Sequence, residues 1–169
     1  MNSISPRASK QINWSTIVMF ALGFWLSGSL VFDCLLVPGM LTSGMMKESG
    51  FASAGYIIFG TFNHLELICA AIVLAGCLVY RFGDRLATKM TNKSVLTASI
   101  LLVIALAYTY ILTPQMSGMG MSLDMFESGE SVSNSMAAMH LIYWSLEVIK
   151  LISATVLLRG FYRSSCSIV

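Results

Sequence analysis

The sequence predicts an all-α membrane protein, a single domain built as a bundle of four transmembrane helices. Of its 169 residues, 56% belong to the apolar and aromatic set and only 11% are charged. Soluble domains carry about 25% charged residues, whereas the mean hydropathy of this chain is +0.77. These values argue against a disordered chain, a nucleic-acid-binding tail and a soluble enzyme.

Four apolar stretches are long enough to cross the hydrocarbon core, which takes about 20 residues of helix. They run from about 14 to 37, from 54 to 80, from 95 to 113 and from 137 to 158. A helix satisfies its own backbone hydrogen bonds, so helices are the only structure expected here. We expect the first span to stop at Pro38-Gly39 and the third at Pro114, because proline interrupts a helix.

Basic residues near the ends of the spans predict the orientation. They precede the first span, separate the second from the third and follow the fourth, as Arg7, Lys10, Arg81, Arg85, Lys89, Lys93, Arg159 and Arg163. The segments 38–53 and 114–136 hold only Lys47 as a basic residue. The excess of positive charge therefore places both termini and the 81–94 loop on the cytoplasmic or stromal side. No small-residue cleavage site follows the first span, so we treat it as a span and not as a signal peptide.

Ionisable residues inside the spans are functional-site hypotheses, because each costs about 2.5–3.5 kcal/mol on insertion scales. At a rise of 1.5 Å per residue, depth groups them in three pairs. The pairs are Asp33 with His140, His64 with Glu147, and Glu66 with Lys150. Glu66 with Lys150 is the preferred pair, because an unpaired lysine at that depth is the costliest outcome. Glu147 is an alternative partner for Lys150 at the i,i+3 spacing.

Helical phase, at about 100° per residue, adds a second constraint. On the fourth span it places five side chains on one face that we expect to look into the bundle: His140, Tyr143, Trp144, Glu147 and Lys150. On the second span Asn63 and Glu66 share a face, while His64 lies opposite Glu66. The predicted intramembrane polar network is Asp33, Asn63, Glu66, Glu147 and Lys150. Three interpretations stay open for it: hydrogen bonds that hold the bundle together, a proton or ion pathway, or a bound cofactor.

The two histidines suggest a haem or a chlorophyll, because imidazole ligates iron or magnesium in apolar surroundings. A haem held by both rings needs equal depth, whereas the depth estimate separates His64 from His140 by about 9 Å. A single-histidine ligand is therefore the hypothesis, with His64, His140, Tyr143 and Trp144 as the cofactor-binding candidates. His140 with its aromatic neighbours is the better pocket. The alternative is a histidine that packs through hydrogen bonds.

Methionine is frequent, with 12 in the chain. Met116, Met119 and Met121 form an M-x-x-M-x-M pattern in the segment after the third span, here called the outer Met motif. Thioether sulfur is a soft ligand that selects Cu(I), so this motif is a candidate copper site. The alternative is flexible apolar filler at a membrane or protein surface.

The spans also contain small residues and cysteines. Glycine and serine in the first two spans are expected to allow close helix approach, at Gly23, Ser27, Gly28, Gly55 and Gly60. The cysteines are expected to be small, buried and inert, because Cys34, Cys69, Cys77 and Cys166 form no C-x-x-C.

The stretches FALGFWLSGSLVFDCLLVP (20–38) and AGYIIFGTFNHLELICAA (54–71) resemble the family called domain of unknown function 4149, which includes the eukaryotic transmembrane protein 205. The likeness extends to Thr113-Pro114 and His140. The run FNHLELICAA is similar to cyanobacterial members, which implies a thylakoid or plasma membrane. The resemblance implies the four-helix membrane fold and no particular chemistry.

No nucleophile–base arrangement, glycine-rich phosphate loop or metalloprotease motif is present, so we expect no enzymatic activity. The leading hypothesis is an accessory or assembly subunit that packs against larger membrane complexes, photosynthetic ones among them. Its expected partners are membrane lipid and other integral membrane subunits, with no nucleic acid. The alternatives are a copper-handling protein at the outer face, and a chlorophyll- or haem-binding protein that uses a membrane histidine.

Overall fold

The computed structural model describes residues 14–43, 51–82, 92–118 and 130–166, and within these ranges it contains helices and no strand. Four helices in this described part of the chain are long and apolar enough to cross a membrane. They span Trp14–Met40, Ser53–Phe82, Asn92–Gly118 and Ala138–Ser164. The prediction of an all-α bundle with four candidate spans is confirmed, and each observed span is longer than its prediction or shifted by a few residues.

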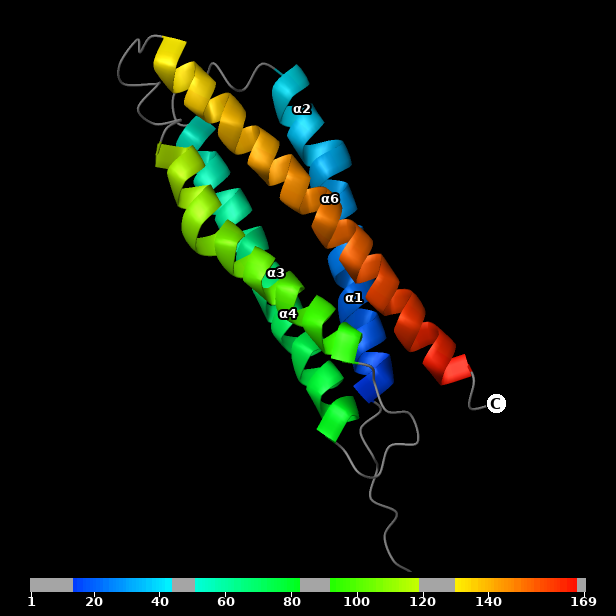
Figure 1. The fold of residues 1–169 in the computed structure, drawn as a ribbon. Helices are drawn as coiled ribbons and strands as arrows, with labels where there is room; N and C mark the ends of the chain where they lie inside the picture. The colour runs from blue at the N-terminus through cyan, green and yellow to red at the C-terminus, as the bar shows by residue number, and fades with distance from the viewer. Residues whose placement is uncertain (1–13, 44–50, 83–91, 119–129, 167–169) are drawn as a thin grey trace, which may run out of the picture.

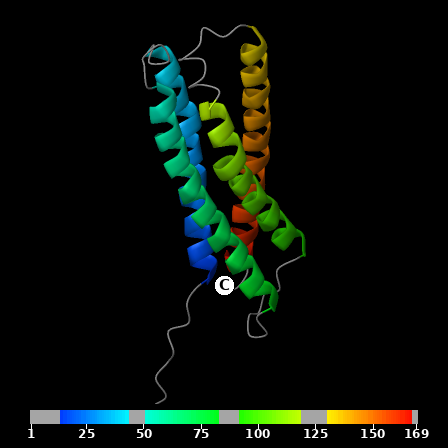
Figure 2. The same ribbon diagram turned by 90° about the vertical axis from the view of Figure 1, so that its left-hand side faces the viewer.

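The helices pack side by side as a bundle along one axis (Figures 1 and 2). In chain order they are α1 (Trp14–Val31), a π-helical segment (Phe32–Leu36), α2 (Val37–Thr42), α3 (Phe51–Phe82), α4 (Asn92–Ala107), a second π-helical segment (Tyr108–Leu112) and α6 (Glu130–Cys166). α1 and α4 each pack against both α3 and α6. As a result, α3 and α6 face each other across the axis of the bundle.

One end of the bundle gathers the exposed basic residues of the described part of the chain. The start of α1, the end of α3, the start of α4 and the end of α6 lie together in both ribbon views (Figures 1 and 2). Arg81, Lys93, Arg159 and Arg163 are exposed on these helix ends. We call this the basic end. Its position in the cytoplasm or stroma stays a prediction from the charge pattern.

The expectation that two prolines end their helices is wrong. The helix of the first span continues through Pro38 to Thr42, and the helix of the third span continues through Pro114 to residue 118. Proline clashes with the carbonyl group four residues earlier, which belongs to Cys34 for Pro38 and to Tyr110 for Pro114. Each of these two residues is the centre of a π-helical segment. The wider turn accommodates the proline ring, so the chain bends without stopping.

A tightly packed apolar core fills the bundle between its middle and the basic end. It is built largely from small and β-branched side chains, among them Val18, Ala70, Val73, Ala98 and Ala154. α1 and α3 approach closely at Gly76, where an added Cβ would overlap a methyl group of Val18. Small residues at such positions let membrane helices approach closely.

The sequence prediction of close approach was only partly right. Gly28 packs against Phe62, whose ring would lie 3.2 Å from an added Cβ. Gly23, Gly55 and Gly60 have no such neighbour within 4 Å, so the structure shows no close helix approach at these positions. Cys69 and Cys77 are buried and free, as predicted, but Cys34 is exposed.

Candidate functional site

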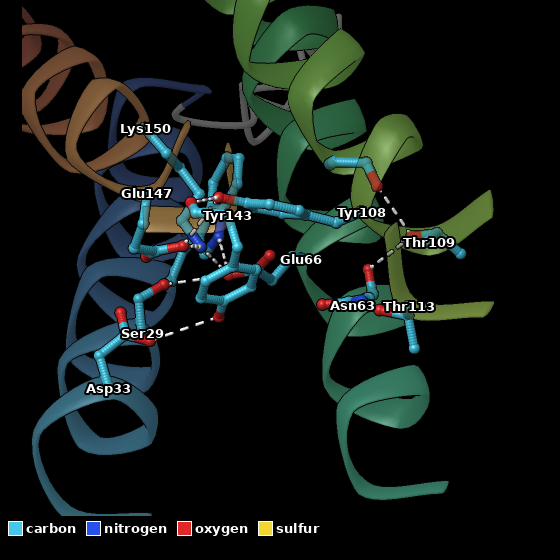
Figure 3. A network of polar contacts seen from close by, with 12 residues as sticks. Ser29, Asp33, Asn63, Glu66, Tyr108, Thr109, Thr113, Tyr143, Glu147 and Lys150 are labelled. Atoms are coloured by element: carbon cyan, nitrogen blue, oxygen red, sulfur yellow. Dashed lines mark hydrogen bonds and ion pairs between the residues drawn. The ribbon is translucent and has the colours of Figure 1, made fainter. Parts of the chain in front are cut away.

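The centre of the candidate site is an ion pair between opposite helices. Lys150 Nζ on α6 lies 2.6 Å from Glu66 Oε1 on α3, and the two side chains are only 3% and 2% exposed. Figure 3 shows the pair inside the bundle. Both residues lie near the middle of their spans, Ser53–Phe82 and Ala138–Ser164. The predicted pairing of Glu66 with Lys150 is confirmed.

Lys150 also binds a second carboxylate on its own helix. Its Nζ atom lies 2.8 Å from Glu147 Oε2, and Glu147 is 1% exposed. The i,i+3 alternative is therefore present together with the preferred pair. The ammonium group also lies 5.1 Å from the centre of the Tyr108 ring, a distance at which a cation is attracted to an aromatic face.

Neutral donors complete the shell around the two glutamates. Trp25 Nε1 and Ser29 Oγ on α1 donate to Glu66 Oε1 over 2.9 and 3.0 Å. The Tyr108 hydroxyl lies 3.1 Å from Glu147 Oε2 and 3.2 Å from the backbone oxygen of Tyr143, either of which can accept its proton. Sequence analysis did not single out these three donors. The signal that could have found two of them is spacing, because Trp25 and Ser29 precede Asp33 by eight and four residues on one helical face.

Asp33 lies in the first π-helical segment and is 7% exposed. Its Oδ1 atom accepts a long hydrogen bond, 3.4 Å, from the Tyr143 hydroxyl. Its Oδ2 atom is buried with no hydrogen-bond partner among the described residues, and the same holds for Glu147 Oε1. The donor that the structure assigns to Asp33 is thus a tyrosine that the depth analysis had not paired with it.

Asn63 belongs to a separate polar cluster between α3 and α4. It is buried on the same side of α3 as Glu66, as predicted. Its Nδ2 atom donates to Thr113 Oγ1 over 2.6 Å. Thr109 Oγ donates to the Ala105 carbonyl oxygen over 2.8 Å and lies 3.4 Å from the Asn63 carbonyl oxygen. Figure 3 places this cluster apart from Lys150, so it ties the two helices together without joining the charged groups.

The predicted inward face of α6 is narrower than expected. Glu147 and Lys150 are buried and Tyr143 is half-buried, but His140 is exposed and Trp144 is 45% exposed. At 100° per residue, His140 and Trp144 lie roughly 50° and 90° from the centre of the three inward side chains. The expectation was therefore wrong for His140 and Trp144, which lie at the edge of the face. The Trp144 ring meets the Tyr143 ring edge-on, with centroids 6.1 Å apart.

His64 lies on the outer surface of α3, so the expected pairing with the buried Glu147 is wrong. Its Nδ1 atom lies 2.6 Å from the backbone oxygen of Gly60, one turn earlier. Because a carbonyl oxygen only accepts, Nδ1 carries the proton, and the lone pair of the neutral ring is on Nε2. The exposed positions of α3 around this ring form a stripe, here called the His64 stripe: Ile57, Thr61, His64, Ile68, Ala71 and Ala75.

The outer Met motif falls mostly outside the described residues. Met116 lies in the helical end of the third span and is half-buried, whereas Met119 and Met121 lie beyond residue 118. Within the described ranges, no group of three or more His, Cys, Asp or Glu side chains could hold a metal ion. Copper binding by the motif stays a prediction.

The chain gives no match to any protein-family model, to any curated protein or to any solved structure. The resemblance to the family called domain of unknown function 4149 therefore stays a prediction.

Proposed function

We propose that the chain is a non-enzymatic integral membrane protein that serves as an accessory or assembly subunit and packs against larger membrane complexes. The observation that supports this proposal is His64. Its ring is exposed on the outside of α3, about 5 Å along the helix from the middle of the span Ser53–Phe82. A polar nitrogen left in hydrocarbon costs several kcal/mol. A donor from a neighbouring subunit removes that cost, so His64 marks a contact face.

The surface around His64 is suited to a partner helix. The His64 stripe combines isoleucines with threonine and alanine, and small residues of this kind let two backbones approach closely in a membrane. Beside it, a shallow groove of about 410 Å³ runs between α1 and α3, lined by apolar side chains such as Phe20, Phe24 and Ile72. The charged groups of Glu66, Glu147 and Lys150, in contrast, are turned inward. In the proposed setting the basic end faces the cytoplasm or stroma of a thylakoid or plasma membrane, and the complexes include photosynthetic ones.

The test is the native mass of the protein after gentle solubilisation from its own membrane. Wild-type protein is expected to migrate in an assembly larger than the monomer, and His64→Leu is expected to release it. Thr155→Leu is the matched control, because Thr155 is also exposed but its hydroxyl is satisfied by the Leu151 carbonyl oxygen of its own helix, 2.8 Å away. Wild-type protein that migrates alone, or an assembly that His64→Leu leaves intact, would contradict the proposal.

A second candidate, the binding of a chlorophyll or a haem, is favoured by the same imidazole. The hydrogen bond from Nδ1 to Gly60 fixes the ring and leaves Nε2 pointing outward, as second-shell bonds do in histidine ligands of metals. Gly60 itself has no neighbouring atom within 4 Å of an added Cβ, so this side of α3 is open next to the imidazole.

An absorption spectrum of the protein from its native membrane separates the two candidates. A Soret or red band that His64→Ala removes and His140→Ala retains identifies a cofactor on His64. A band that only His140→Ala removes would place the cofactor on α6. A colourless preparation would reject the cofactor hypothesis and leave the subunit proposal.

A further inference from the structure

Two buried oxygen atoms of the polar network have no hydrogen-bond partner among the described residues: Asp33 Oδ2 and Glu147 Oε1. Their side chains are 7% and 1% exposed. The two carboxyl groups interact with each other electrostatically, and Figure 3 shows both beside the Tyr143 ring. Leaving a buried carboxylate oxygen unpaired costs about 1–3 kcal/mol or more. The presence of two such oxygens in the same polar network therefore needs a physical explanation.

The charges of the network do not balance. Its described members include three carboxyl groups, on Asp33, Glu66 and Glu147, and one ammonium group, on Lys150. Full ionisation would leave three negative charges against one positive charge, a net charge of −2 inside the bundle. Both ion pairs of Lys150 are made with Glu66 and Glu147, which leaves Asp33 without a cation among the described residues.

Among the described residues that bond to Asp33 or Glu147, only Lys150 carries a permanent positive charge. Tyr143 on α6 and Tyr108 of the second π-helical segment are neutral donors. Glu66 on α3 adds a negative charge, and Lys150 is the cation already used. His140, on α6, is exposed at the edge of the inward face. Two neighbouring carboxyl groups in apolar surroundings disfavour simultaneous ionisation, which favours a proton on one of them.

We propose that Asp33 and Glu147 share one proton and form a carboxylic acid–carboxylate pair, a built-in proton-binding site of the bundle. Lys150 and Tyr108 both contact Oε2 of Glu147, which stabilises the ionised form of that residue. The proton therefore belongs to Asp33, whose Oδ2–H group donates to Glu147 Oε1. One hydrogen atom satisfies both unpartnered oxygens and reduces the net charge from −2 to −1.

The proton reaches this site from the end of the bundle opposite the basic end. Asp33 lies seven residues before Met40, the last residue of its span, which is about 10 Å along the helix. Glu66 and Lys150, in contrast, lie near the middle of their spans. Binding moves one proton from water onto Asp33, and release returns it to water with no other group changed. This inference does not depend on any partner or cofactor at His64.

Infrared spectroscopy of the whole protein in lipid nanodiscs tests the pair directly, because a protonated carboxylic acid has a carbonyl stretch that a carboxylate lacks. The wild-type protein is expected to show this band at neutral pH, with a shift in D₂O. Asp33→Asn is expected to remove the band and to keep the fold, because the amide NH₂ group replaces the acid as donor to Glu147 Oε1. Asp33→Leu, which offers no donor, is expected to be less stable than Asp33→Asn.

Tyr143→Phe is the second variant, because it keeps both carboxyl groups and removes the hydroxyl that bonds to Asp33 Oδ1. It is expected to shift the acid band to higher frequency without removing it. A wild-type spectrum without the band, or a band that persists in Asp33→Asn, would overturn the proposal. Sodium or potassium that co-purifies stoichiometrically and is lost in Asp33→Asn would overturn it as well, since a metal cation would then fill the place of the proton.

Discussion

Replacing Lys150 with methionine removes the positive charge that both glutamates of the network contact. The ammonium group lies 2.6 Å from Glu66 Oε1 and 2.8 Å from Glu147 Oε2, and all three side chains are at most 3% exposed. Methionine has a similar length and fills the same space, so the change mainly tests charge. Removing one partner of a buried ion pair typically costs about 3–5 kcal/mol, because the remaining charge is left uncompensated.

The lower part of that range is expected here, about 3 kcal/mol, because a carboxyl group without its cation takes up a proton. Glu66 retains its bonds from Trp25 and Ser29, and Glu147 retains Tyr108 and, in the proposed pair, the proton of Asp33. Adding Glu147→Gln or Glu66→Gln to Lys150→Met removes one of the uncompensated carboxylates, so each should restore part of the lost stability, with a coupling energy of about 0.5–3 kcal/mol.

The assay is reversible unfolding in mixed micelles, followed by circular dichroism and tryptophan fluorescence. Lys93→Met is the control, because Lys93 is exposed in the first turn of α4 and its replacement should change the free energy of unfolding by no more than about 0.5 kcal/mol. The prediction is refuted if Lys150→Met lowers the free energy of unfolding by no more than Lys93→Met does, or if neither glutamine substitution restores stability.

Four other outcomes are expected. Gly76→Ala should destabilise the bundle by about 1–3 kcal/mol in the same unfolding assay, because the new methyl group meets Val18; Gly23→Ala, in open space, should not. Tyr108→Phe should cost about 1–3 kcal/mol, since Glu147 loses a buried donor, and an unchanged midpoint would contradict this. A cysteine placed at Arg85, in a variant without the native cysteines, should react with an impermeant thiol reagent only from the cytoplasmic or stromal side. Replacing the three methionines of the outer Met motif with leucine should lower the Cu(I) affinity of the purified protein, and an unchanged affinity would reject the copper hypothesis.

The parts of the structure that could be predicted are those that depend on fixed helix geometry. Span number follows from length and hydropathy, and the contact between Glu66 and Lys150 follows from a rise of 1.5 Å and a turn of 100° per residue. Trp25, Ser29 and Tyr108 were missed because neutral donors disturb the hydropathy of a span very little. His64 was assigned the wrong partner because depth alone does not say which side of a helix faces its neighbours.

The helix ends were mispredicted for a reason that bears on the site. Pro38 and Pro114 were expected to end their helices, but each follows a π-helical segment that accommodates its ring. These two segments carry Asp33 and Tyr108. Irregular turns of this kind are frequent at functional sites. Each π-helical segment before a proline therefore holds a residue of the polar network: Asp33, which contacts Tyr143, and Tyr108, which contacts Glu147.

The imbalance of charge separates two interpretations of the network that the sequence left open. Hydrogen bonds that only hold the bundle together would need Glu66, Lys150 and their neutral donors, and a buried ion pair by itself is weak support for stability or function. Asp33 does not belong to that arrangement, because its one assigned bond is 3.4 Å long and its second oxygen has no described partner. A carboxyl group at such a position is therefore better explained by the proton that it binds than by the packing that it provides.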